Sequence, residues 1–157
     1  EFHVPVCIAR VAQCFGPGLS LLDNRVSMQF AKSVIYNENI ILHTTGQSVS
    51  NFCYITDVLS ALVLLLFKGE CGEAYNICHD EETRSIASIA QLVATHVSNN
   101  KSKVVFDIPE DVQGFGYAPT VHMFLSSKKL KSLGWKPKVS MAQAYIRLAE
   151  YIQEEGL

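Results

Sequence analysis

The sequence lacks a hydrophobic run long enough to cross a membrane. Its longest purely apolar stretch, Ala61 to Phe67, falls far short of the roughly 18 to 20 residues that a membrane-spanning helix requires. Nothing in the composition indicates disorder, because 48% of the 157 residues are hydrophobic and the mean hydropathy is +0.16. These values predict a single folded domain with one core.

An excess of charge of one sign is also missing. The 13 basic and 15 acidic residues give a formal charge of -2, and neither sign forms a long block. The electrostatics therefore argue against a nucleic-acid partner and against a membrane-surface partner. The lysines at 128, 129, 131, 136 and 138 form the one basic cluster. They are interpreted as a solvated helix face and turn, with an anion-binding role as the alternative.

Histidine and cysteine do not form local ligand motifs. No two of the five histidines stand three or four residues apart, so the sequence predicts no metal site. The five cysteines are odd in number, show no C-x-x-C spacing and mostly occur in apolar segments. They indicate reduced thiols and a reducing, cytoplasmic location. The chain starts at Glu1-Phe2-His3, without an initiator methionine or a signal-peptide pattern, so we expect a piece of a longer protein.

The stretch from Gly46 to Phe67 predicts a loop, a short strand and a buried helix. Asn51-Phe52-Cys53-Tyr54 is short and aromatic, as a strand should be, and Thr56 is a good N-cap. Asp57 would then face the positive end of the helix dipole. Only Ser60 is polar from Val58 to Phe67, so we expect this helix to be covered on more than one side.

The remaining pattern alternates strands and helices, which is typical of an α/β fold. Gln13 to Leu19 follows a continuous apolar run, and in open parallel sheets such loops line the ligand crevice. The segment Ile108 to Phe124 carries four glycines and prolines and should be irregular. Predicted strands are Val4–Arg10, Ile40–His43, Ala74–Cys78 and Lys103–Asp107; predicted helices are Val26–Ile35, one capped by Ser85, a short one from Ser126 or Ser127 to Leu133, and Met141–Glu154.

Three motifs carry a resemblance to a known family. The first has the spacing G-x-x-x-R-x-F-x-Y-V-x-D-x-x-x-A, with Gly46, Phe52, Tyr54, Asp57 and Ala61 at the matching positions. It is followed by the pattern G-E-x-Y-N in Gly72-Glu73-Ala74-Tyr75-Asn76. Arg10 to Pro17 is similar to R-x-x-N-V-Y-G-P, and Ser127 to Lys136 is similar to a lysine-rich segment ending in L-G-W-x-P. The chain thus resembles the C-terminal half of the extended short-chain dehydrogenase/reductase family, which contains the NAD-dependent nucleotide-sugar epimerases and dehydratases.

The resemblance implies a fold and a function. Residues 1–157 would form the C-terminal strands of a Rossmann-type parallel sheet plus a small α/β substrate-binding lobe, without the N-terminal dinucleotide-binding half. The full-length protein would be an isomerase or lyase that uses NAD or NADP, binds a nucleotide sugar and forms a homodimer. Arg10 and Val11 would lie beside the cofactor, and the substrate would be bound by Gln13, Phe15, Arg25, Ser50, Asn51 and Tyr117.

The catalytic pair of the family is missing from this chain. The family's base is a tyrosine with a lysine four residues on, and none of the six tyrosines here is followed by lysine at that spacing. The glycine fingerprint G-x-G-x-x-G fails as well, because Leu21 follows Gly16-Pro17-Gly18 and Pro119 follows Gly114-Phe115-Gly116 at the third glycine position. We therefore expect no catalytic residue, no NAD bound to this fragment and no activity of the fragment alone.

Two departures within the motifs concern the substrate. Gln13 replaces the family's asparagine, and a longer amide can still donate and accept. Ser50 replaces the arginine, and serine cannot make a bidentate contact to a diphosphate. Either another cation compensates, with Arg25 or Lys128 as candidates, or the substrate differs. A relative that has lost its chemistry and serves as a binding or assembly module is the alternative reading.

Overall fold

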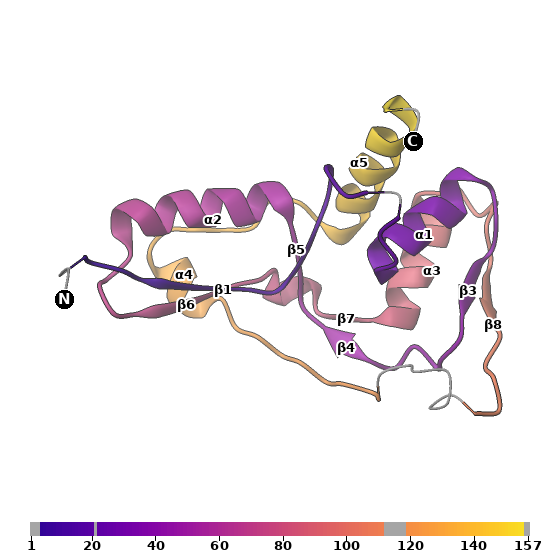
Figure 1. Cartoon of the computed structure of the whole chain (residues 1–157), viewed down its shortest axis with the longest axis horizontal. Helices are drawn as coiled ribbons and strands as arrows, with labels where there is room; N and C mark the ends of the chain where they lie inside the picture. Colours follow the sequence, from indigo (N-terminus) through magenta and orange to yellow (C-terminus); the bar gives the residue numbers. More distant parts are fainter. Residues whose placement is uncertain (1–3, 21, 112–118, 156–157) are drawn as a thin grey trace.

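The computed structural model of the chain describes residues 4–20, 22–111 and 119–155 (Figure 1). Strands and helices alternate along it. The strands are β1 (Ile8–Val11), β2 (Gln13–Phe15), β3 (Ile40–Leu42), β4 (Val49–Ser50), β5 (Phe52–Tyr54), β6 (Ala74–Ile77), β7 (Arg84–Ser85) and β8 (Val104–Phe106); the helices are α1 (Val26–Ile35), α2 (Ile55–Lys68), the 3-10 turn η1 (Asp80–Glu82), α3 (Ile86–His96), α4 (Lys128–Ser132) and α5 (Met141–Glu154).

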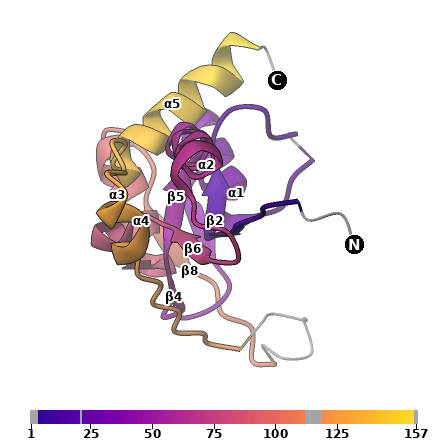
Figure 2. The ribbon, with the colours of Figure 1, turned by 90° about the vertical axis from the view of Figure 1, so that its left-hand side faces the viewer.

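The strands pair two by two, and most pairs are parallel. β1 pairs with β6, β2 with β5 and β3 with β8, all parallel, whereas β4 and β7 are antiparallel. Helices join the parallel strands, as a parallel connection requires (Figures 1 and 2). The α/β class predicted from the sequence is confirmed.

Two hydrophobic cores divide the described residues. The larger one joins α1, α3 and α5 to β2, β3 and β5, with Met28, Ile89, Tyr145 and Leu148 among its most buried side chains. The smaller one lies under α2 and contains Val58, Ala61, Leu65, Tyr75, Ile77, Leu130 and Trp135. Cys53 belongs to the smaller core and its neighbours Phe52 and Tyr54 to the larger, because successive side chains of β5 point to opposite faces.

Helix α2 differs from its sequence-based prediction in two ways. It begins at Ile55 with Tyr54 as N-cap and no side-chain cap, so Thr56 lies inside the first turn. The reason is that β5 continues directly into the helix and leaves no room for a polar capping loop. The expected cover on more than one side is also wrong for the described residues, because Leu66 and Phe67 are 79% and 80% exposed.

The first predicted strand is shorter than expected. The continuous apolar run Val4 to Arg10 is typical of a strand buried on both faces, but β1 spans only Ile8–Val11 and its four residues are exposed. Within the described part of the chain β1 has one hydrogen-bonded neighbour, β6, and its other edge is unpaired.

Several helix ends follow the sequence closely. Ser85 accepts a hydrogen bond from the backbone N–H of Ser88 at 3.1 Å, so the predicted cap of α3 is confirmed. Helix α5 has the predicted bounds and begins with a capping box between Ser140 and Gln143, which the sequence analysis missed. Helix α4 starts at Lys128, and Ser127 makes no side-chain cap bond. In residues 119–124 of the irregular segment the one strand-like contact is a bridge between His122 and Val49.

Asp57 connects the two cores. Its carboxylate is buried, with 3% of the residue exposed, and accepts hydrogen bonds from the backbone N–H groups of Lys138 and Val139, both at 3.0 Å. The indole N–H of Trp135 donates to the Asp57 carbonyl at 3.3 Å and to Ser60 Oγ at 3.0 Å. The start of α2 thereby fixes the segment that runs from α4 in one core to α5 in the other.

We expect Asp57→Ala to destabilise the protein by roughly 2 to 4 kcal/mol, because it leaves the backbone N–H groups of Lys138 and Val139, the second of them buried, without an acceptor. Urea unfolding followed by circular dichroism measures this change. Glu150→Ala, on the exposed side of α5, is the control and should change stability by less than about 0.5 kcal/mol. Equal effects of the two substitutions would show that the carboxylate does not hold the connection.

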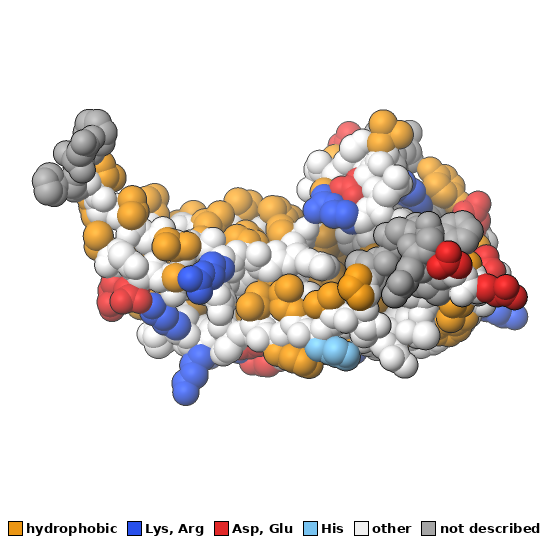
Figure 3. Space-filling model, turned by 60° about the horizontal axis from the view of Figure 1, so that its bottom comes forward, with side chains coloured by type: hydrophobic (Ala, Val, Ile, Leu, Met, Phe, Trp, Pro, Cys, Tyr) orange, Lys and Arg blue, Asp and Glu red, His pale blue; other side chains and the backbone are white. Residues whose placement is uncertain are grey.

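The exposed apolar face of α2 generates a second prediction. Leu59, Leu62, Val63, Leu66 and Phe67 on α2 are exposed, and so are Val4, Val6 and Ile8 beside the unpaired edge of β1. In Figure 3 hydrophobic side chains run along the upper edge of the left half of the molecule, and further ones lie at its centre and on its right. Patches of this kind and open strand edges both favour association.

We expect the chain to self-associate at concentrations of about tens of micromolar, since several exposed side chains would each gain about 1.5 to 3 kcal/mol of burial. Sedimentation velocity should report a mass above the 17.4 kDa of the monomer. Substituting Leu66→Glu should shift the protein toward the monomer. A clean monomer for the unsubstituted chain would contradict the prediction.

Candidate substrate-binding site

A pocket of about 370 Å³ lies where β2 and β5 meet the start of α1. The parallel register sets Gln13 opposite Phe52, and the turn before α1 adds further polar groups. Three of the six predicted substrate residues, Gln13, Phe15 and Arg25, line this pocket. The other lining residues are Cys14, Asn24, Val26, Ser27 and Phe52.

Two phenylalanines form the apolar wall of the pocket. Phe15 and Phe52 are each 4% exposed, and their rings meet edge to face with centroids 6.2 Å apart. Such contacts fix both rings in place. Gln13 comes from the same face of β2 as Phe15 and is exposed, so its amide is available to a ligand.

Arg25 is held in position by Asp23. Its Nε and Nη2 donate to the Asp23 carboxylate at 2.9 and 2.6 Å, and its backbone N–H donates to Oδ1 at 2.8 Å. These hydrogen bonds hold the pKa of the Asp23 carboxyl below its usual range and raise the pKa of Arg25. The guanidinium thus stays charged, and much of that charge is already balanced by the carboxylate.

Gly16 lies in the loop after β2, where the chain packs closely against the start of α2. A Cβ on Gly16, whose φ is +148°, would lie 2.5 Å from Ile55 Cγ2 and 3.1 Å from the Tyr54 ring. The close approach of the strand-to-helix junction therefore requires glycine at this position. This contact accounts for Gly16 without a bound phosphate.

Ser50 and Asn51 directly precede Phe52 in the chain and do not line the pocket. Ser50 is 8% exposed and stands opposite Arg84 in the pairing of β4 with β7. The Asn51 side chain is fully buried; it donates to Thr83 Oγ1 at 2.5 Å and accepts from the Leu125 N–H at 2.6 Å. These bonds give Asn51 a structural role, and its assignment as a substrate residue stays a prediction.

The other predicted residues lie elsewhere. Arg10 and Val11 are exposed on β1, next to β6, and their assignment to a cofactor stays a prediction. Tyr117 lies outside the described residues. Lys128 is exposed on α4. Of the other lysines on that helix, Lys129 is ion-paired with Glu73, and Lys131 is paired with Asp80 at 2.6 Å and with Glu81 at 3.0 Å.

Two polar residues of the pocket, one in the turn before α1 and one in its first turn, were not predicted from the sequence. Asn24 and Ser27 surround Arg25 at the start of that helix. Their polar side chains next to an arginine were the available signal.

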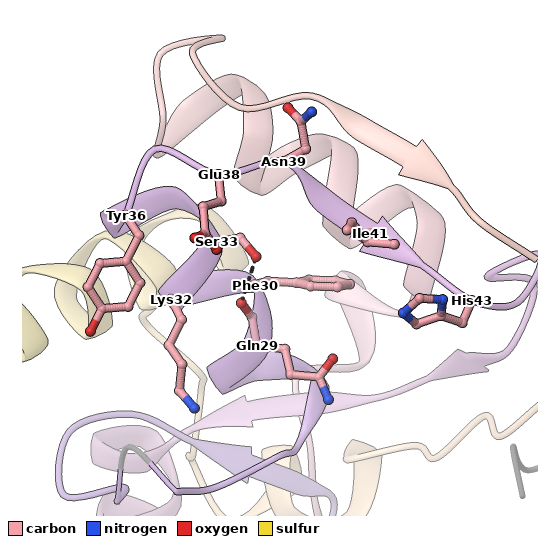
Figure 4. Close-up of a pocket in the computed structure, with 9 residues that line it drawn as sticks. All are labelled: Gln29, Phe30, Lys32, Ser33, Tyr36, Glu38, Asn39, Ile41 and His43. Carbon is pink, nitrogen blue, oxygen red and sulfur yellow. Dashed lines mark hydrogen bonds between the residues drawn. The ribbon is translucent and has the colours of Figure 1, made fainter. Parts of the chain in front are cut away.

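A larger hollow of about 470 Å³ lies between α1 and β3 (Figure 4). It is open and lined by Gln29, Lys32, Tyr36 and His43, among others, and Ser33 Oγ donates to the Gln29 carbonyl at 3.1 Å. None of the predicted site residues lines it. The smaller pocket at Gln13 is therefore the better candidate site.

Known proteins resemble this chain over nearly all of its length. Residues 1–78 match the model of the NAD dependent epimerase/dehydratase family. A dTDP-D-glucose 4,6-dehydratase of Bos taurus is 30% identical over 98% of this chain, and a UDP-glucuronic acid decarboxylase 3 of Arabidopsis thaliana is 26% identical over 91%. The chain covers 42% and 40% of these two proteins, so it spans less than half of their length.

Solved structures show the same fold. The UDP-glucose 4-epimerase of Thermotoga maritima, solved with UDP-glucose, superposes on the whole chain with a TM-score of 0.82 and 22% identity, over 48% of its own length. The UDP-glucuronic acid 4-epimerase of Bacillus cereus, solved with UDP-glucuronic acid and NAD, gives 0.78 and 21% over 99% of this chain and 47% of its own. The fold of this chain is therefore that of about half of an epimerase of this kind.

Other kinds of site find no support in the described residues. They contain no cluster of three or more histidine, cysteine or acidic side chains that could hold a metal ion. No helix in the described ranges is long and apolar enough to cross a membrane.

The surroundings of Cys14, Cys53 and Cys78 make these thiols unreactive. All five are free thiols. Burial raises the pKa of Cys53 to about 12 and of Cys78 to about 11, with smaller contributions from Asp57 and Asp80 respectively. Burial also raises the pKa of Cys14, and the nearby Arg25 partly offsets this effect. None of the three offers a thiolate nucleophile near neutral pH.

We expect an alkylating reagent at about pH 8 to modify the exposed Cys71 much faster than Cys53 or Cys78, because the latter two stay protonated and buried. Mass spectrometry of a timed iodoacetamide reaction measures the rates. In denaturant all five cysteines should react at similar rates, which serves as the control. Rapid labelling of Cys53 in the folded protein would contradict the burial of this strand.

Proposed function

We propose that this chain is the C-terminal, substrate-binding part of an NAD-dependent nucleotide-sugar epimerase or dehydratase. The observation that carries the proposal is the pocket in which Gln13, Phe15 and Arg25 meet. These three residues come from the motif that resembles R-x-x-N-V-Y-G-P and from the helix that follows it. Similarity to nucleotide-sugar enzymes over 98% of the chain supports the same conclusion.

The pocket has the chemistry that a nucleotide sugar requires. An amide such as Gln13 both donates and accepts hydrogen bonds, which suits a sugar hydroxyl or a base edge. The phenylalanine wall offers an apolar face for a base or a sugar ring. Arg25 can share its guanidinium between Asp23 and a phosphate oxygen.

The cofactor, NAD or NADP, would be held by another part of the full-length protein. Gly16 is accounted for by its contact with Ile55, and the cysteines near the pocket stay protonated. The chain would thus bind and orient the nucleotide sugar, while the hydride acceptor and the catalytic base come from outside these residues. The fragment alone would be inactive.

We further propose a cytoplasmic homodimer as the working state of the full-length protein. Five free thiols suit a reducing compartment. The exposed apolar face of α2 supports association with a second copy.

A non-catalytic binding or assembly module is the second candidate. Ser50 favours it, because the family pattern has an arginine at this position that could bind a diphosphate. If the function has been lost, the pocket should no longer select nucleotide sugars.

We expect the 157-residue chain to bind UDP-glucose or dTDP-glucose in calorimetric titrations and to show no binding of NAD. Amide exchange from Gln13 to Leu19 should slow when the sugar nucleotide is added. Binding of NAD at about micromolar concentration would contradict the assignment as a substrate-binding part. Absence of binding to both sugar nucleotides would favour the non-catalytic module.

A further inference from the structure

Arg84 stands directly opposite Ser50. β4 and β7 are antiparallel, and their register pairs Val49 with Ser85 and Ser50 with Arg84. Opposite residues of an antiparallel pair project their side chains to the same face. The neighbouring residues confirm this geometry, because Asn51 and Thr83 meet through a hydrogen bond of 2.5 Å on the other face.

The face that carries Ser50 and Arg84 also carries Phe52, a residue of the pocket wall. Ser50 precedes Phe52 by two residues, so the alternation of an extended chain puts both on one side. Phe52 lines the pocket together with Gln13. Glu82, the ion-pair partner of Arg84, lines a small cavity with Phe15 and Phe52. Glu82 therefore lies next to the phenylalanine wall, and it connects Arg84 to that wall through their ion pair.

The guanidinium of Arg84 is oriented by a hydrogen bond that engages only its Nε. Its Nε donates to Glu82 Oε2 at 2.8 Å, and 37% of its side chain is exposed. Its terminal Nη atoms make no hydrogen bond to any of the residues that the structure describes. Arg25 differs, because Asp23 engages both its Nε and one of its Nη atoms.

We propose that Arg84 supplies the cation that the family pattern places at position 50, and that it contacts the phosphate groups of the bound nucleotide. The inference rests on the proposed function. Ser50 is small and neutral, which leaves space on its face for the guanidinium of the opposite strand. Arginines at both positions would place like charges opposite each other, which is unfavourable. A small neutral residue at position 50 is thus compatible with an arginine at position 84, whereas a second arginine there is not.

Titration of the 157-residue chain with UDP and with uridine tests this contact. Arg84→Gln should weaken UDP binding about tenfold or more, because a charge-assisted hydrogen bond is lost. Binding of uridine, which has no phosphate, should stay unchanged. Lys101→Gln, which removes an exposed cation after α3, is the control and should alter neither affinity.

Two further variants separate a phosphate contact from a structural role. The exchange Ser50→Arg with Arg84→Ser should restore UDP binding to within about threefold of the original chain, since the cation returns to the same face. Glu82→Gln should strengthen UDP binding, because it removes a negative charge beside the guanidinium. If the Arg84–Glu82 pair has a purely structural role, Arg84→Gln and Glu82→Gln should each weaken the binding of both UDP and uridine. That result would overturn the proposal.

The outcomes also separate this inference from the proposed function. If the unsubstituted chain binds neither UDP nor UDP-glucose, the proposed function fails and the role of Arg84 fails with it. If the chain binds UDP and Arg84→Gln binds it equally well, the role of Arg84 alone is wrong.

Discussion

The buried carboxylate of Asp57 is the contact on which the arrangement of the two cores depends. It lies at the start of α2 and accepts hydrogen bonds from the backbone of Lys138 and Val139, 81 and 82 residues further along the chain. Trp135, just before this segment, packs in the smaller core, and Val139 belongs to the larger one. One charged group therefore positions the crossing between the cores, and an unpaired backbone N–H at this depth would be costly.

The position of the pocket follows from this arrangement. Because β5 runs directly into α2, the junction at Tyr54 and Ile55 presses against the loop after β2 and requires Gly16 there. The same strand sets Phe52 opposite Gln13. The apolar wall of the site is therefore part of the larger core, and only the polar groups at its rim are free to vary with the ligand. Because Gln13 is exposed, a side chain of different length at this position would leave the buried contacts of Phe15 and Phe52 in place.

Local sequence patterns predicted the elements whose ends are set by local contacts. Helix α5 and the cap of α3 at Ser85 were predicted because capping uses residues within one turn. The start of α2 was missed, since the cap expected at Thr56 requires a loop that the fold replaces with β5. The exposure of Val4 to Arg10 was missed as well, because an apolar run does not reveal which neighbours its strand will find. Gln13 and Phe15 could be grouped from a motif, and Arg25 could be named as a candidate cation, whereas the placement of Arg84 depends on the register between two distant strands.

Arg25 and Arg84 are both held by an ion pair with a nearby acidic residue. Each is paired with an acidic residue two positions earlier, Arg25 with Asp23 and Arg84 with Glu82. A carboxylate at this spacing fixes a long, flexible side chain before any ligand arrives, so less conformational entropy is lost on binding. It also offsets part of the positive charge of each guanidinium. The proposed phosphate contacts would thus rely on the prior orientation of the two guanidinium groups more than on their full charge.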